Sequence, residues 1–184
     1  MATKKEQEFL LNCAKNAILN YQNITYPGLN KLSETLKEKK GVFVTLTLNG
    51  QLRGCIGTIQ PIMPLYEAVM KNAVSAAYSD PRFPPMTKEE ANDLIIEISV
   101  LTEPLKLNYT NPSDLLKKLN HEQGIIIKKS FATATFLPQV WEQLPDKEEF
   151  LTHLCLKANL HPQAWKDNNI EVSTYKVEKF GRYN

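Results

Sequence analysis

The sequence predicts an α+β protein with a mixed, mainly antiparallel sheet and flanking helices. Apolar residues recur at helical spacing in several segments, and short β-branched runs lie between those segments. Some of these runs pair across tight turns typical of β-hairpins, which favours antiparallel pairing over a doubly wound parallel sheet. With 184 residues, of which 42% are hydrophobic, the chain can bury a core within a single domain spanning residues 1–184.

The N-terminal region is expected to be helical. Residues 3–21 carry an apolar stripe, and Thr3 with Glu6 forms a capping-box pattern at its start. After a loop that contains a Pro-Gly pair, residues 31–40 favour a short helix with Gly41 as its C-terminal cap.

A β-hairpin is expected over residues 41–59. Residues 42–48 are β-branched and aliphatic, Asn49 and Gly50 suit the positive φ angles of a type I′ turn, and apolar residues resume at Leu52. Because the turn holds two residues, the pairing of the two strands can be counted outward from it.

The expected register gives the hairpin an unusual face. Leu46 faces Arg53 and Val44 faces Cys55, which places an arginine and a thiol on one face with two aliphatic side chains. A purely structural strand does not need that combination. This strand is therefore the first candidate for a functional site.

Two interpretations of the strand stay open. In the functional one, the guanidinium of Arg53 favours the thiolate of Cys55, and the amides around Gly54 and Gly57 bind an anionic ligand. In the structural one, Cys55 is packed, the stem of Arg53 covers apolar surface, and the glycines serve a β-bulge.

A helix is expected from Pro64 to about Ala77, followed by a proline-rich loop. The apolar stripe of the helix is rich in small residues, which predicts close packing onto the sheet. In the loop, prolines restrict the backbone around Asp80, Arg82 and Phe83, as in a binding loop. The alternative is a connector in which Asp80 caps local amides, Arg82 is solvated and Phe83 fills the core.

A central strand is expected over residues 94–101, because both of its faces are mostly apolar. Glu97 is the exception, and Arg53 and Arg82 are the candidate partners of its carboxylate. Thr87 and Glu90 form a capping pattern at the start of an expected short helix. The other expected elements are a helix over 111–119, a hairpin formed by 125–128 and 131–136, a helix that begins at 146–149 and ends before 161–162, and a strand over 170–177.

Composition excludes several classes of function. The formal net charge is +2 and the basic residues are scattered, which argues against nucleic-acid binding. No apolar run reaches membrane-spanning length, and the N-terminal sequence lacks the apolar core of a signal peptide, so no membrane association and a cytoplasmic location are expected. The three histidines show no ligand spacing and there is no glycine-rich phosphate loop, so no metal and no cofactor are predicted.

The cysteines are odd in number and far apart in the sequence. Cys13, Cys55 and Cys155 therefore favour a reducing compartment over a disulfide framework. Cys13 and Cys155 lie on apolar helix stripes, which predicts that both are packed in the core.

Five motifs occur in order along nearly the whole chain: LRGCIGTI at 52–59, SDPRFPP at 79–85, SVL at 99–101, ATFLPQVW at 134–141 and FLTHLCLKANL at 150–160. Together they resemble the AMMECR domain family, the AmmeMemoRadiSam system protein A family. The resemblance implies one compact α+β domain with a larger and a smaller lobe. It also implies company with a radical SAM protein and a MEMO-type protein, and any radical chemistry would then be carried out by a partner.

With this resemblance, the sequence predicts an enzyme or enzyme component in a modification pathway. Cys55 is the candidate nucleophile or acid–base group, and Arg53 holds it ionised and binds an anionic group. Motif residues from two segments are expected to converge on this site, where the substrate-binding candidates are Gly54, Gly57, Asp80, Arg82 and Phe83. The alternative is a non-catalytic module that docks a partner through the LRGCIG and DPRFPP segments, with an exposed patch around Phe83.

Overall fold

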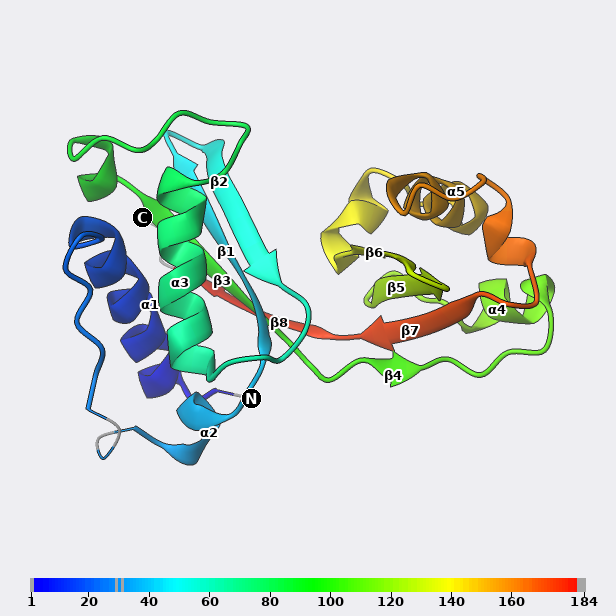
Figure 1. Cartoon of the computed structure of the whole chain (residues 1–184), viewed down its shortest axis with the longest axis horizontal. Helices are drawn as coiled ribbons and strands as arrows, with labels where there is room; N and C mark the ends of the chain where they lie inside the picture. The colour runs from blue at the N-terminus through cyan, green and yellow to red at the C-terminus, as the bar shows by residue number, and fades with distance from the viewer. Residues whose placement is uncertain (1, 29, 31, 182–184) are drawn as a thin grey trace. The chain divides into compact units, whose positions relative to one another are not determined.

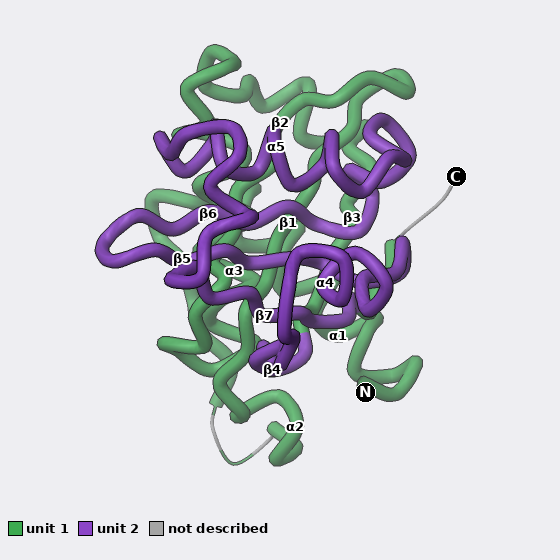
Figure 2. The backbone as a smooth tube through the Cα atoms, turned by 90° about the vertical axis from the view of Figure 1, so that its right-hand side faces the viewer, with its two compact units in different colours: residues 1–101, 178–184 green, residues 102–177 purple. Residues whose placement is uncertain are grey.

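The computed structural model describes residues 2–28, 30 and 32–181, and the chain divides into two compact units. Unit 1 comprises Met1–Leu101 and Glu178–Asn184, and unit 2 comprises Thr102–Val177 (Figure 2). Each unit contains its own four-stranded antiparallel sheet and its own helices (Figure 1). The predicted α+β class is therefore confirmed. The assignment of residues 1–184 to a single domain stays a prediction.

Unit 1 is a sheet with two long helices against one face (Figure 1). Its strands lie in the order β2-β1-β3-β8, so that β1 and β3 are central and β2 forms an edge. Helices α1 and α3 pack against each other and against the sheet. The elements are α1 Lys4–Leu19, α2 Glu34–Lys37, β1 Gly41–Leu48, β2 Gln51–Thr58, α3 Leu65–Tyr78, the 3-10 helix η2 Glu90–Asn92, β3 Ile95–Leu101 and β8 Val177–Gly181.

Helix α1 begins with the predicted capping box. The Thr3 hydroxyl accepts a hydrogen bond from the Glu6 N–H at 3.3 Å, and the Glu6 carboxylate accepts one from the Thr3 N–H at 2.7 Å. The apolar stripe of the helix is buried, and Cys13 with it, as predicted. The core of unit 1 forms between the two helices and the sheet, and its fully covered side chains include Leu10, Ala14, Val42, Val44, Leu46, Val69 and Ile98.

The predicted second helix is shorter than expected, and its cap is wrong. Of residues 31–40, only those of α2 are α-helical, and residue 31 lies outside the described residues. Gly41 begins β1 instead of ending a helix. An added Cβ at Gly41 would lie 2.4 Å from the carbonyl oxygen of Ile59, so the close approach of two backbone segments requires glycine here.

The β1–β2 turn is as predicted, with φ angles of 50° at Asn49 and 75° at Gly50. The predicted register holds for the two pairs beside the turn. A β-bulge then shifts the pairing by one residue, so that Thr45 faces Cys55. The predicted pairing of Cys55 with Val44 is therefore wrong, because the bulge adds a residue to β2.

The same shift determines how α3 packs on the hairpin. Leu46 pairs with Gly54, and not with Arg53 as the uninterrupted register predicts. A Cβ built on Gly54 would lie 2.0 Å from the carbonyl oxygen of Ala76 in α3. The absence of a side chain at Gly54 therefore allows the close helix–sheet packing that the small residues of α3 predict.

Unit 2 contains a sheet with the strand order β4-β7-β5-β6. Strands β5 and β6 form the predicted hairpin, and β5 also pairs with β7. The elements are β4 Leu105–Lys106, α4 Pro112–Lys118, β5 Gly124–Lys129, β6 Ala132–Phe136, the 3-10 helix η3 Pro138–Glu142, α5 Lys147–Lys157, the 3-10 helix η4 Ala164–Lys166 and β7 Glu171–Tyr175.

The two helices of unit 2 begin at the predicted residues. The Asn111 side chain caps α4, and the Asp146 side chain caps α5 by accepting a backbone N–H three residues on. The rings of Trp141 and Phe150 stack with their centroids 3.5 Å apart in the core of the unit. Cys155 is fully buried on α5, so its predicted packing role is confirmed.

The predicted last strand over 170–177 is wrong in its extent. The chain forms β7, leaves the strand conformation at Lys176 and then forms β8, and the two strands belong to different sheets. The backbone N–H and C=O of Lys176 both bond to Thr102, the first residue of unit 2. The backbone therefore enters and leaves unit 2 at one hydrogen-bonded point.

Candidate functional site

Asp80 anchors the proline-rich loop to strand β2. Its side chain is 1% exposed, and Oδ2 accepts a hydrogen bond from the Cys55 N–H at 2.8 Å. The same carboxylate accepts bonds from the Arg82 backbone N–H at 3.1 Å and from Arg82 Nε at 3.0 Å and Nη2 at 2.7 Å. The guanidinium of Arg82, with the two backbone donors, holds the pKa of Asp80 well below its usual range.

Arg82 presents the exposed end of this ion pair. Its side chain is 53% exposed, and Nη2 also donates to the backbone carbonyl of Cys55 at 3.3 Å. The pKa of Arg82 is raised, chiefly by Asp80 and to a smaller extent by Cys55. Both backbone polar groups of Cys55 are therefore bonded to one buried carboxylate and its partly exposed guanidinium partner.

Arg53 is bonded to a residue that sequence analysis assigned only to a helix cap. Its Nε and Nη2 donate to the two carboxylate oxygens of Glu90 at 2.7 and 3.0 Å. Arg53 lowers the pKa of Glu90 to about 2, and the Thr87 N–H, which donates to the same carboxylate, adds to the effect. The predicted partnership of Arg53 with the Cys55 thiolate stays a prediction.

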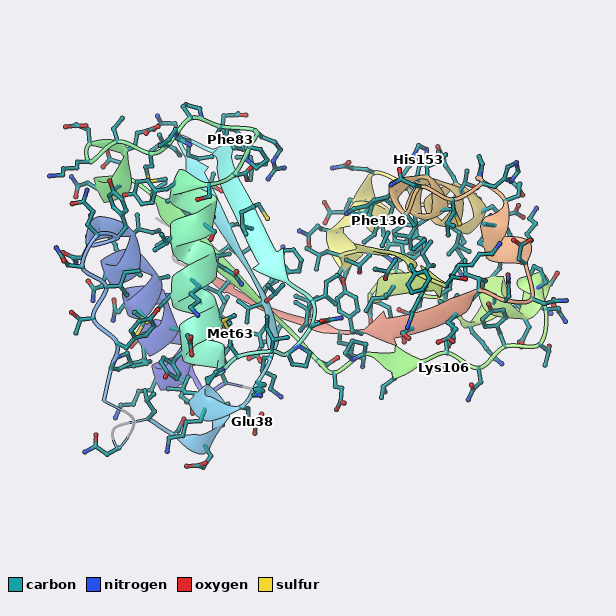
Figure 3. The ribbon with its side chains drawn as sticks, in the orientation of Figure 1. Glu38, Met63, Phe83, Lys106, Phe136 and His153 are labelled. Atoms are coloured by element: carbon teal, nitrogen blue, oxygen red, sulfur yellow. The ribbon has the colours of Figure 1, made fainter. Side chains whose placement is uncertain are left out.

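Phe83 lies between the two arginines. The centre of its ring is 5.9 Å from Cζ of Arg53 and 5.5 Å from Cζ of Arg82, both within cation–π range. Phe83 projects from the loop that follows α3 (Figure 3) and is only partly exposed. The ring links the Arg53–Glu90 pair to the Asp80–Arg82 pair.

Cys55 differs from the other two cysteines in its surroundings. Its Sγ lies 3.3 Å from Oγ1 of Thr45 on β1, and its side chain is partly exposed. Burial raises the pKa of Cys13 to about 11, and burial also raises the pKa of Cys155. The Cys55 thiol is therefore partly exposed, whereas those of Cys13 and Cys155 are buried.

The structure therefore brings together the five motif residues that were expected to converge, which are Arg53, Cys55, Asp80, Arg82 and Phe83. The glycines have packing roles as well. Gly54 admits α3, and a Cβ on Gly57 would lie 2.3 Å from the ring of Phe43. The catalytic and substrate-binding roles of these residues stay predictions.

Comparison with known proteins places the chain in a family. The sequence model of the AMMECR1 family matches residues 11–180. The chain belongs to the AMMECR1 family. The protein MK0488 of Methanopyrus kandleri is 42% identical to it, with 97% of this chain and 89% of the relative covered. The protein PF1979 of Pyrococcus furiosus is 41% identical, with 94% and 86% covered.

A solved crystal structure has the same fold. The crystal structure of the uncharacterized protein PH0010 from Pyrococcus horikoshii matches this chain with a TM-score of 0.88 and 37% sequence identity. The match covers 98% of this chain and 93% of that chain. The predicted family is therefore confirmed, and the match extends over nearly the whole chain.

Two residues of this site, Glu90 and Thr45, were not among the predicted site residues, and one predicted pair is wrong. Glu90 was recognisable only as part of a capping pattern with Thr87, and Thr45 faces Cys55 only because of the bulge. Glu97 bonds to Lys179 of β8 at 3.1 Å, whereas both candidate arginines bond to other carboxylates.

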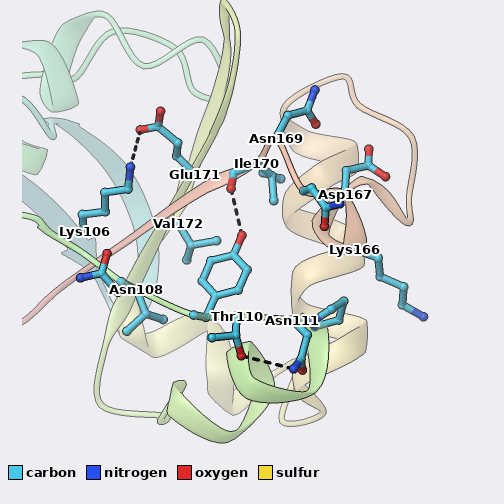
Figure 4. A pocket seen from close by; sticks show the side chains of 14 residues that line it. Lys106, Asn108, Thr110, Asn111, Lys166, Asp167, Asn169, Ile170, Glu171 and Val172 are labelled. Carbon is cyan, nitrogen blue, oxygen red and sulfur yellow. Dashed lines mark hydrogen bonds and ion pairs between the residues drawn. The ribbon is translucent and has the colours of Figure 1, made fainter.

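A separate pocket of about 510 Å³ lies within unit 2 of the AMMECR1 fold (Figure 4). Its wall is mostly polar, and the hydroxyl of Tyr109 donates to the Ile170 carbonyl at 2.9 Å inside it. Lys106 and Glu171 form an ion pair of 3.9 Å at its side. None of the catalytic or substrate-binding candidates predicted from the sequence lines this pocket.

Neither a membrane-spanning helix nor a metal-binding group of side chains occurs among residues 2–28, 30 and 32–181. No helix there is both long enough and apolar enough to cross a membrane. No three or more His, Cys, Asp or Glu side chains there form a group suited to a metal ion.

Proposed function

We propose that this AMMECR1-family protein is an enzyme, or a component of one, that acts on a small molecule with an anionic group. Cys55 is the nucleophile and Arg82 binds the anion. One observation carries the proposal: both backbone polar groups of Cys55 bond to the Asp80–Arg82 pair. The carboxylate of this pair is buried and its guanidinium is exposed, so a thiol and a cation are presented side by side.

The proposed step is attack by the Cys55 thiolate on an electrophilic carbon. A bond forms between Sγ and that carbon, the bond to the leaving group breaks, and the leaving group departs with the electron pair. Arg82 Nη1 has no hydrogen-bond partner among residues 2–28, 30 and 32–181, and it donates to the anionic group of the substrate.

The other motif residues support this arrangement. Asp80 positions Arg82, and Arg53 positions Phe83 through its pairing with Glu90. The Cys55 N–H points away from β1, and backbone alternation therefore directs the Gly57 N–H to the same edge of β2. There it serves as a further donor to the substrate, whereas Gly54 contributes by admitting α3.

The proposed setting is a cytoplasmic modification pathway shared with a radical SAM protein and a MEMO-type protein. Membership of the AMMECR1 family supports these partners. The free cysteines support a reducing compartment. In this proposal the radical chemistry belongs to the partner, and the present chain supplies a nucleophile and an anion site.

Alkylation of the full chain by two reagents of different charge tests the proposal. Iodoacetamide is neutral and iodoacetate is anionic, and both react by loss of iodide to a thiolate. At pH 7 we expect Cys55 to react at least about tenfold faster than Cys13 and Cys155, measured by peptide mass spectrometry. We also expect iodoacetate to be favoured at Cys55, and Arg82→Gln to remove that preference.

The charge-preserving variant Arg82→Lys is the matched control and should keep part of the preference. If Cys55 is as inert as the two buried cysteines, the enzyme proposal fails and the docking alternative takes its place. If Cys55 reacts equally well with both reagents, the thiol is reactive but Arg82 is not an anion site.

A further inference from the structure

A second pocket, of about 510 Å³, lies within unit 1. Residues of α1, of the segment 20–27 that follows it, and Met70 of α3 line this pocket. Figure 1 shows that the segment runs back alongside α1 after the helix ends. None of the described lining residues belongs to β2 or to the loop that carries Asp80, so the pocket is separate from the Cys55 site.

The floor of the pocket is apolar. Its buried lining residues are Cys13 and Ala17 of α1 and Met70 of α3, which are 9%, 1% and 2% exposed. Cys13 and Ala17 are four residues apart and therefore lie on one face of the helix. Burial raises the pKa of Cys13 to about 11, so the floor disfavours charged groups.

Two aromatic residues, Phe9 and Tyr26, belong to the wall of the pocket. The ring of Tyr26 meets the ring of Tyr66 of α3 edge-on, with the centroids 6.5 Å apart. This contact holds one wall in place without a ligand. Aromatic walls favour a flat, unsaturated ligand, because rings of that kind stack well on one another.

Three asparagine amides lie at the rim, where their side chains are exposed. The turn at the end of α1 brings them together. The Asn20 N–H donates to the Asn16 carbonyl at 3.0 Å, and the Asn23 N–H donates to the Asn20 carbonyl at 2.8 Å. Within residues 2–28, 30 and 32–181, the side chains of Asn16 and Asn23 form no hydrogen bond. Each of these two amides therefore offers donors and an acceptor to a ligand.

We propose that this pocket binds an uncharged planar heterocycle of the nucleobase class. Its volume is typical of a small-molecule site, and its described lining contains no charged side chain. An asparagine amide donates to a ring nitrogen and accepts from an exocyclic amino group at the same time when it binds the edge of adenine. The apolar floor and the aromatic wall suit the faces of such a ring. A phosphate group finds no cationic partner among the described lining residues.

Adenosine and AMP are the probes, because they share a base and differ by a charged phosphate. The full chain carries isotope-labelled methyl groups on its methionines, and their NMR signals are followed during titration. We expect adenosine to shift the signal of Met70 in a saturable manner. The signals of Met63 and Met86 should stay in place, because neither residue lines the pocket. We expect AMP to bind roughly tenfold more weakly, because the phosphate must lose water without gaining a partner.

Two variants test the wall and the rim. Tyr26→Ala removes an aromatic ring and Asn16→Ala removes an amide, and each should weaken adenosine binding by roughly tenfold. Both side chains are exposed, so the fold should persist. Tyr21→Ala is the matched control for the ring, because Tyr21 is also 43% exposed but stacks on Tyr78 outside the pocket. Asn108→Ala, in the pocket of unit 2, is the control for the amide. Both controls should keep the wild-type affinity.

The outcomes decide between this site and its alternatives. A Met70 shift that weakens only in Tyr26→Ala and Asn16→Ala supports the inference. The absence of a saturable Met70 shift would overturn it, as would binding of AMP that is as tight as that of adenosine. Equal affinities in Tyr26→Ala and Tyr21→Ala would place the ligand elsewhere. Alkylation of Cys55 does not enter these measurements, so this inference and the proposed function can fail separately.

Discussion

Oδ2 of Asp80 accepts a hydrogen bond of 2.8 Å from the backbone N–H of Cys55, 25 residues earlier in the chain. Strand β2 is an edge strand, so this N–H has no neighbouring strand to bond to on that side. The loop after α3 therefore completes the hydrogen bonding of the strand edge with a carboxylate. One contact closes the edge and joins the two motifs.

Replacement of Asp80 by Ala should be strongly destabilising. The change leaves the Cys55 N–H without its buried acceptor, and an unsatisfied buried hydrogen-bonding group typically costs about 1–3 kcal/mol, whereas the half-exposed Arg82 guanidinium can be solvated. The free energy of unfolding in urea is the measurement. Glu34→Ala, which removes a carboxylate that is 89% exposed, is the control and should change little. Equal effects of the two changes would show that the Asp80 contacts contribute little.

The loss of folding stability at low pH should depend on Glu90. Its pKa is about 2 in the folded chain, against about 4.3 when unfolded, so below that unfolded value the unfolded chain binds a proton that the folded chain does not. This contribution to stability is complete above about pH 5 and is lost as the pH falls towards 2. The slope of unfolding free energy against pH between 5 and 2 should therefore be shallower in Glu90→Gln than in the wild type. Parallel slopes would contradict the Arg53–Glu90 pairing.

Gly54→Ala should destabilise unit 1 through a steric clash between β2 and α3. The new Cβ would meet the Ala76 carbonyl at 2.0 Å, so α3 must move away from the sheet, at a cost of roughly 1–3 kcal/mol or more. Thermal unfolding followed by circular dichroism measures the effect. Gly28→Ala is the matched control, because its nearest neighbour is a flexible side-chain atom at 3.0 Å. A stable Gly54→Ala variant would mean that the helix lies farther from β2.

Phe83→Leu should weaken the link between the two arginines. The change keeps apolar volume but removes the ring that both guanidinium groups approach, at a cost of about 1 kcal/mol in unfolding free energy. It should also reduce the preference of Cys55 for iodoacetate, because Arg82 loses a positioning contact. Phe131→Leu, at a fully exposed ring in unit 2, should do neither. An unchanged iodoacetate preference would limit Phe83 to a packing role.

Local signals in the sequence predicted the hairpin turn and the helix starts because the residues that cause them are adjacent. Asn49 and Gly50 suffice for the turn, and Thr3 with Glu6 suffices for the first cap. The register of the hairpin was not predictable in this way. The bulge lies at Arg53, whose side chain is held by Glu90, 37 residues away, and no local pattern reports that contact.

The candidate site, like the fold, was predicted only in its local features. The two motifs predicted which segments meet, because their arginines, thiol and carboxylate are unusual for packing alone. The partners within the site differ from those expected, since each pairing depends on tertiary distances. Glu97 pairs with Lys179 of β8. The sequence pattern did not separate β8 from β7, because only one residue, Lys176, lies between the two strands.

The order of the strands has a consequence for synthesis of the chain. Unit 2 is inserted between β3 and β8 of unit 1, and Thr102 and Lys176 close it at its base. During translation, all strands of the unit 2 sheet leave the ribosome before β8 is available to pair with β3. The unit 2 sheet can therefore form on the ribosome first, and the sheet that carries Cys55 acquires β8, with Lys179, only after unit 2 has been synthesised.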